Sequence, residues 1–225
     1  MNPLKYNFWL RRTTTILSVT ILTLAIIATI TGILIGFNYQ PAAGEAYKSL
    51  ANITQTIPYG ELIYSLHNLA GNGIIAIALI QIIVMFLGRQ FIGSWLTAWI
   101  SGILLTLTTI GLGWTAMILG WNQLGYWRLK VELGIIESVP LLGETIRNIL
   151  TGGGGINTTT VIHFYNLHSY VLSVAAIVLS SIHLIALLIQ EQQHKNQLLL
   201  QLEKAMASTT SEASKNEAEN TTSGV

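Results

Sequence analysis

The stretch SLHNLAGNGIIAIALIQ, residues 65–81, carries a histidine near its start and a glutamine fourteen residues later, inside an apolar segment. A second apolar stretch, FYNLHSYVLSVAAIVLSSIHL over residues 164–184, carries His168 and His183, fifteen residues apart. Fourteen residues of α-helix rise about 21 Å and fifteen about 22 Å, and both return to nearly the same face. The pattern predicts two long helices, each with two polar side chains on one face.

The composition of the chain is that of a membrane protein. Of its 225 residues, 51% are hydrophobic and only 9% are charged, far less charge than a soluble surface needs. A net charge of +1 provides no basic face for nucleic acid. The chain contains no cysteine, which excludes disulfides, thiolate metal sites and cysteine nucleophiles. Aspartate is absent as well, so glutamate supplies every carboxylate side chain.

Four stretches without Asp, Glu, Lys or Arg are long enough to cross a bilayer, which takes about 20 apolar residues. They cover residues 13–44, 62–88, 90–127 and 148–190, and they predict helices near 14–37, 61–87, 93–119 and 161–190. The predicted fold is all-α, a polytopic membrane four-helix bundle over residues 14–190. Residues 1–13 precede it, and the first helix is too long for a signal peptide, so it is expected to be retained. Residues 191–225 form a tail, predicted to be disordered from about residue 208 because it lacks an apolar face.

The distribution of Lys and Arg predicts the orientation of the bundle. With the N-terminus inside, seven basic residues fall on the inner side: Lys5, Arg11, Arg12, Arg89, Lys195, Lys204 and Lys215. Four fall on the outer side: Lys48, Arg128, Lys130 and Arg147. This excess favours cytoplasmic termini.

The long outer loop, residues 120–160, mixes charged with apolar positions. This mixture predicts one or two amphipathic helices that lie on the membrane surface. Pro140 is expected to start the second helix and Gly152 to end it.

The histidines are the candidate functional residues, since polar side chains within a membrane are costly and usually have a function or a partner. Because the second and fourth helices run in the same direction, His67 and His168 are expected at the same depth, facing each other diagonally across the bundle. Such a pair can ligate one haem iron from both faces, although each imidazole could instead simply bond a neighbouring helix. Gln81 and His183 match in a deeper layer, where His183 has no imidazole opposite it and both a structural and a ligand role stay open. His163 is expected to make a polar contact near the membrane surface, and His194 to be solvated.

Several motifs, in order, resemble cytochrome b6 and the matching N-terminal half of cytochrome b, the haem subunit of Rieske-type quinol-oxidising complexes. They are FNYQPAAGEAYKSL after the first helix, SLH in the second, GWNQLGYW after the third, TGGGG, and FYNLH followed by His183. The likeness covers about residues 16–184. The family carries two haems, held by histidine pairs on its second and fourth helices.

By this resemblance, His67 and His168 are the axial ligands of the outer haem iron, and His183 occupies one inner ligand position. The inner partner of His183 falls on Gln81, which is a poor ligand for haem iron. The resemblance therefore implies one b-type haem at the outer site and leaves a second, inner haem open. We expect His183 to bond to a helix neighbour or to Gln81.

Other residues on the inner side also differ from the family pattern. Val84 and Leu188 stand where basic residues are expected near the haem carboxylates, and Ile16 stands where the family has a cysteine. The family has small residues on its first and third helices, where a haem approaches the backbone. This chain also has small residues at those positions, in pairs fourteen residues apart. These are Gly32 and Ala116 at the outer site, and Ser18 and Gly102 at the inner one. Asn68 and His163 replace the usual outer arginines.

The resemblance implies an electron-transfer subunit of a quinol:acceptor oxidoreductase, one that is not catalytic alone. The implied partners are quinol, a Rieske iron–sulfur protein and a subunit with the remaining cytochrome b helices, in the lipid of a plasma or photosynthetic membrane. The alternative is a haem-poor membrane scaffold or assembly subunit. A dihaem anchor of a dehydrogenase is a third possibility, which GWNQLGYW and FYNLH fit less well.

Overall fold

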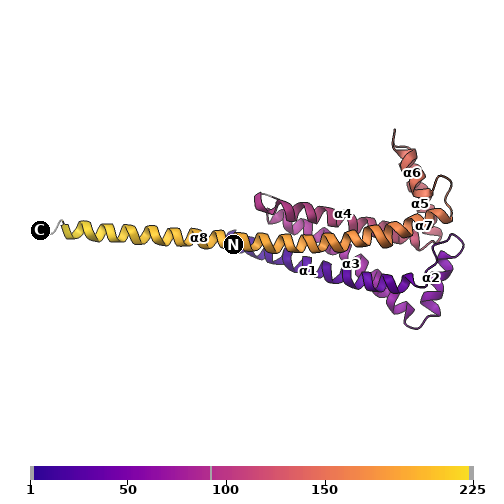
Figure 1. The fold of residues 1–225 in the computed structure, drawn as a ribbon, viewed down its shortest axis with the longest axis horizontal. Coiled ribbons are helices and arrows are strands. Elements are labelled where there is room, and N and C mark those ends of the chain that lie inside the picture. The colour runs from indigo at the N-terminus through magenta and orange to yellow at the C-terminus, as the bar shows by residue number, and fades with distance from the viewer. Residues whose placement is uncertain (1–2, 92, 223–225) are drawn as a thin grey trace.

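The computed structural model describes residues 3–91 and 93–222, with the side chains of residues 8–91, 93 and 95–210. Four helical rods dominate it (Figure 1). Three are α1 (Pro3–Gly36), α3 (Gly60–Leu87) and α4 (Leu96–Leu119), the last preceded by a 3-10 turn, η1 (Gly93–Trp95). The fourth joins α7 (Thr158–Asn166), a π-helical turn, η2 (Leu167–Leu172), and α8 (Ser173–Thr222) without a break. Each rod contains a segment long and apolar enough to cross a membrane, which confirms the predicted all-α membrane bundle.

The four rods form a ring in which α1 packs on α3, α3 on α4, α4 on α8, and α8 on α1. The helices that carry the paired polar residues, α3 and the η2–α8 rod, therefore lie diagonally opposite each other, as expected. One end of the bundle carries α2, α5 and α6, and the other carries the N-terminus and the α3–α4 turn (Figure 1). We call these the outer end and the inner end.

The bundle core is divided into layers along its length. The middle layer is an apolar cluster of Ile21, Ala25, Ile74, Ala78 and Leu105. Other apolar clusters lie at the inner end, around Met85, Trp95 and Leu187, and at the outer end, around Ile118, Leu129 and Phe164. Large apolar side chains elsewhere on the spans point outward, as a lipid-facing surface requires.

The outer end is capped by three short helices. The two predicted helices are present as α5 (Gln123–Glu137) and α6 (Gly143–Thr151), of which α6 is amphipathic, whereas α5 has apolar residues on its buried and its exposed faces. The second helix begins at Gly143 rather than at Pro140, which lies in the turn, and Gly152 ends it in the left-handed region at φ 80°. Glu132 ties α5 to α4 by accepting a hydrogen bond from Trp114 Nε1 at 2.6 Å, and within α5 it also accepts one from Arg128 Nε at 2.7 Å.

A helix that the sequence analysis treated as loop is α2 (Ala46–Gln55). Its buried residues, Ala46, Ser49 and Ile53, recur at helical spacing and face α3. The helical spacing of these three residues is visible in the sequence and could have predicted this helix.

Two helices extend beyond their predicted ends. The first begins at Pro3, and α8 continues to Thr222, where disorder was expected from about residue 208. Residues 191–207 are rich in Leu, Gln, Glu, Lys and Ala, whose high helix propensity explains why the helix continues beyond the apolar span. Residues 208–222 are rich in Ser, Thr and Asn, and their composition does not explain their helical conformation.

The tight turn between α5 and α6 leads to a prediction with an internal control. A Cβ on Gly143 would lie 2.2 Å from the Ile136 carbonyl oxygen, whereas a Cβ on Gly134 would meet nothing within 4 Å. We expect Gly143→Ala to detach α6 from α5 and to lower the melting temperature of the protein in detergent. Gly134→Ala should leave that temperature unchanged or raise it, since Ala is favoured over Gly in a helix by about 1 kcal/mol. Equal melting temperatures for the two variants would contradict the turn geometry.

Candidate functional site

The outer pair consists of His67 on α3 and His168 in η2, with ring centroids 6.3 Å apart and planes inclined at 62°. When two imidazoles bind one metal ion, each metal–nitrogen bond is about 2 Å and the ring centre lies about 1.1 Å beyond the nitrogen, so the centroids should be about 6.2 Å apart. The rings are thus separated by the distance that a shared metal ion requires.

His67 is oriented by α1. Its Nδ1 lies 2.9 Å from the Ala28 carbonyl oxygen and 3.2 Å from Thr31 Oγ1. The Thr31 hydroxyl donates to the Ile27 carbonyl, so Nδ1–H of His67 donates toward Ala28. This tautomer leaves the Nε2 lone pair free, which is the usual arrangement of a metal-binding histidine. Gly32 permits the close approach, because a Cβ there would lie 3.0 Å from His67 Cε1.

His168 is oriented in the same way by α4. Its Nδ1 lies 2.8 Å from Thr115 Oγ1, and the Thr115 hydroxyl donates to the Gly111 carbonyl at 2.9 Å. Thr115 therefore accepts the Nδ1–H of His168, and Nε2 again keeps its lone pair. The two free lone pairs belong to neutral imidazoles whose other nitrogens are already satisfied.

The π-helical turn around His168 explains why fifteen residues separate the two histidines of this rod. A π turn takes in one more residue than an α turn. The fifteen-residue step from His168 to His183 therefore has the angular effect of fourteen residues in a plain α-helix, the spacing of His67 and Gln81. Both helices consequently present their two polar side chains to the bundle interior at both levels.

The inner layer is closed by a direct hydrogen bond. Gln81 Nε2 lies 2.7 Å from His183 Nε2, and His183 Nδ1 lies 3.0 Å from Ser101 Oγ. Ser101 donates to the Ala98 carbonyl, so it accepts from His183 Nδ1–H, and His183 Nε2 accepts the Gln81 amide N–H. The sequence predicted that His183 bonds either to a helix neighbour or to Gln81, and it does both, through Nδ1 to Ser101 and through Nε2 to Gln81. A Cβ on Gly102 would lie 3.0 Å from His183 Cε1, the counterpart of Gly32 and His67.

A metal-bearing macrocycle fits the donor set of the outer layer but not that of the inner one. The two rings of the outer pair have the required centroid separation, and because each Nδ1 is engaged elsewhere, each ring keeps its Nε2 lone pair. In the inner layer, the only imidazole lone pair already accepts a hydrogen bond, and the atom opposite it is an amide nitrogen without a free lone pair. The positions of the missing basic residues are occupied by a half-buried Val84 and an exposed Leu188.

The remaining predicted residues lie around these layers. Ala116 is exposed, and it is the adjacent Thr115 that contacts His168. His163 makes the expected polar contact, through Nδ1 to the Ile149 carbonyl at 2.8 Å, and His194 is exposed. Asn68 is exposed as well.

Ser101 and Thr115, the two hydroxyls that orient His183 and His168, were not among the predicted site residues. They lie fourteen residues apart, each one position before a small residue that the family resemblance indicated, and this spacing is the signal that the sequence offers for them.

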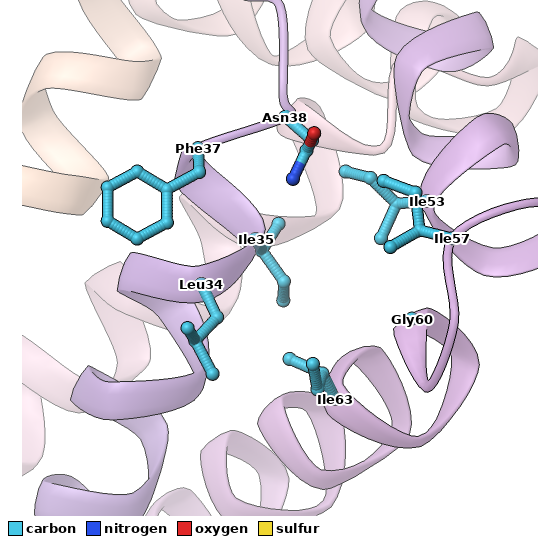
Figure 2. Close-up of a pocket in the computed structure, with 8 residues that line it drawn as sticks. All are labelled: Leu34, Ile35, Phe37, Asn38, Ile53, Ile57, Gly60 and Ile63. Atoms are coloured by element: carbon cyan, nitrogen blue, oxygen red, sulfur yellow. The ribbon is translucent and has the colours of Figure 1, made fainter.

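Two cavities open near the outer end. One, of about 210 Å³, lies between the end of α1, α2 and the start of α3, with isoleucines converging on it and Asn38 as the polar residue (Figure 2). The other, of about 380 Å³, is lined by Ile149, Leu150 and His163 together with Asn166, Leu167 and Val171. Neither includes a residue of the histidine layers.

Tyr39, just beyond the end of α1, contacts α4 and α7 at the outer end. Its hydroxyl donates to the Leu119 carbonyl at 2.8 Å, and its ring stacks on Tyr165 with centroids 5.7 Å apart. Burial raises the pKa of Tyr39 above its ordinary value, so the phenol keeps its proton at physiological pH.

Comparison with known proteins places this geometry in a family. The family model of cytochrome b/b6/petB matches residues 8–192. Cytochrome b6 of Cyanidium caldarium is 31% identical over 162 residues, covering 72% of this chain and 75% of that protein. Cytochrome b6 of Mastigocladus laminosus is 32% identical over 151 residues, covering 67% and 70%.

Among solved structures, a chain of a hyperthermophilic respiratory Complex III matches with a TM-score of 0.65 and 23% identity. The match covers 78% of this chain and 47% of that one, and at this identity it shows the shared fold. The family match spans all four membrane helices and both histidine layers, and the chain therefore belongs to the cytochrome b/b6 family of membrane electron-transfer subunits.

Proposed function

We propose that His67 and His168 hold one b-type haem through their Nε2 atoms, and that the chain serves as an electron-transfer subunit of a quinol-oxidising complex. The observation that carries this proposal is the 6.3 Å separation of the two rings, with both Nδ1 atoms engaged elsewhere. The haem, when bound, supplies one-electron redox chemistry.

The residues of the chain supply ligation, orientation and a dry environment. Ala28 and Thr115 fix the tautomers, and an Nδ1–H that donates to an acceptor makes the other nitrogen a better ligand. Gly32 lets the ring of His67 lie against α1. The apolar middle layer of Ile21, Ala25, Ile74, Ala78 and Leu105 keeps the dielectric constant around the outer pair low.

The inner layer supports a single-haem chain. A second low-spin haem would require the Gln81–His183 bond to break and a ligand other than imidazole to bind opposite His183. The absence of basic side chains at Val84 and Leu188 adds to this difficulty, because carboxylates at a membrane edge are costly without a positive partner.

The proposed partners follow from family membership. The chain would receive electrons from quinol near the outer end, and it would assemble with a Rieske iron–sulfur protein and a subunit carrying the remaining cytochrome b helices. The excess of basic residues at the inner end supports cytoplasmic termini. The surface helices α5 and α6 cap the outer end and are suited to a partner or quinol contact (Figure 1).

The ligand assignment predicts the effect of removing either histidine. We expect His67→Ala and His168→Ala each to abolish the principal haem absorbance in reduced-minus-oxidised visible spectra, because each leaves the iron with a single axial imidazole. His194→Ala is the matched control, since His194 is exposed at the inner end, and it should retain full haem. Full haem in both ligand variants would refute the assignment. No haem in the wild-type protein would favour the scaffold alternative.

The number of haems is a separate prediction. Haem quantification together with electron paramagnetic resonance should give one low-spin haem per chain. Two low-spin haems per chain would contradict the single-haem proposal. A second haem with a high-spin signal would instead show that His183 alone holds it.

Thr115 provides a test of how His168 is oriented. Thr115→Val keeps the shape of the side chain but removes the acceptor for Nδ1–H, and loss of such a partner typically lowers metal affinity 10- to 100-fold. We expect a comparable increase in the haem dissociation rate, measured by transfer to apomyoglobin. Thr108→Val is the control, because Thr108 bonds only to the carbonyl of its own helix. Identical rates in the two variants would show that Thr115 does not orient the ligand.

A further inference from the structure

Buried polar atoms without a hydrogen-bond partner are confined to one half of the bundle. Among the described side chains they are Arg11 Nε, Ser18 Oγ, both amide atoms of Gln90, and Gln190 Oε1. Arg11 and Ser18 lie in the inner part of α1, Gln90 in the α3–α4 turn, and Gln190 on the inner part of α8. Buried polar groups in native proteins are nearly always satisfied, and where protein atoms do not do so, ordered water does.

Two of these atoms, Arg11 Nε and Ser18 Oγ, belong to a seam between α1 and α8, two helices that pack against each other. Arg11, Thr14, Thr15 and Ser18 follow one another at helical spacing on one face of α1. On the α8 side, Glu191 Oε2 lies 3.4 Å from Thr15 Oγ1. The Arg11 guanidinium lies 5.0 Å from the centre of the Trp95 ring, at the inner end of the seam.

The deep end of the seam is the Gln81–His183 pair. Gln81 Nε2 lies 3.4 Å from the Thr14 carbonyl oxygen, one helical turn before Ser18 on the same face of α1. Polar groups therefore follow one another from Arg11 and Glu191, through Thr15 and Thr14, to Gln81. Beyond Ser18 the α1 face becomes apolar with Ile21 and Ala25, which belong to the middle layer.

We propose that this seam, defined by Arg11, Thr14, Thr15, Ser18 and Glu191, binds ordered water that enters from the inner end and reaches the Gln81–His183 pair. The inference rests on the proposed function in one respect, namely that no haem occupies the inner layer. Water satisfies Arg11 Nε and Ser18 Oγ, and the apolar middle layer stops it before the outer pair. The inner half of the bundle is then a hydrated polar site, and the outer half a dry redox site.

The absence of cysteine makes this proposal directly testable, because any introduced thiol is the only one in the chain. Ser18→Cys places a thiol in the seam, and Ala25→Cys places one seven residues further along the same face of α1, in the apolar layer. Both positions are buried, Ser18 with 1% and Ala25 with 5% of its surface exposed. Thiols react as thiolates, whose formation is suppressed in an apolar environment.

In proteoliposomes, a small water-soluble methanethiosulfonate reagent should modify Ser18→Cys at least about tenfold faster than Ala25→Cys, the ratio that one unit of thiol pKa produces. The reaction should require reagent on the inner side, which Arg89→Cys marks because Arg89 is exposed in the α3–α4 turn. Equal rates for the two variants, or reaction from the outer side alone, would overturn the proposal.

A second measurement avoids any change of the seam that the thiol itself introduces. Water-edited solid-state NMR of the wild-type chain should show magnetisation transfer from water to the Gln81 side-chain amide, and Ser18→Val should reduce it. An amide that receives no water magnetisation would overturn the proposal. Haem counted in the same samples separates the two levels of inference. Two haems per chain would refute the single-haem function, whereas one haem with a dry Gln81 amide would refute the seam alone.

Discussion

The structure depends on one constraint, that each imidazole inside the membrane gives its Nδ1–H to a neighbouring helix, because the surrounding lipid offers no hydrogen-bond acceptor. His67 donates toward the Ala28 carbonyl on α1, His168 to Thr115 on α4, and His183 to Ser101 on α4. Each bond holds one helix of the bundle against the next and determines where Nε2 points. These hydrogen bonds therefore join neighbouring helices and, at the same time, leave the Nε2 atoms of the histidines as candidate ligands.

Given that common arrangement, a single side chain distinguishes the two layers. In the outer layer Nε2 of His67 faces another imidazole, and the rings stay apart at 6.3 Å. In the inner layer the residue opposite His183 is Gln81, whose amide is both donor and long enough to close the gap to 2.7 Å. The Gln81 amide N–H donates to the Nε2 lone pair of His183, whereas the Nε2 lone pairs of His67 and His168 cannot hydrogen-bond to each other. Only the outer pair therefore keeps both lone pairs available for a shared metal ion.

Much of this arrangement could be predicted from the sequence, because membrane segments obey simple rules of length, charge and period. The four spans, the diagonal placement of α3 and α8, and the matched depth of Gln81 and His183 all follow from those rules. The helical tail to Thr222 could not be obtained from hydropathy, since helix propensity and membrane insertion are different properties. Thr115 and Ser101 were missed because hydroxyls in membrane helices commonly bond their own backbone, as Thr106 does, and the sequence does not distinguish the two uses.

The π-helical turn Leu167–Leu172 has a consequence for how this rod can change in length during evolution. An insertion in a plain α-helix rotates everything beyond it by about 100° and would turn His183 away from the bundle interior. A π turn confines that disturbance to a few residues, so chains with fourteen or fifteen residues between the two positions can build the same pair of layers. Sequence alignments that force this interval to a single length would then misplace the inner residue by one position, and would hide or invent a ligand where the three-dimensional register has not changed.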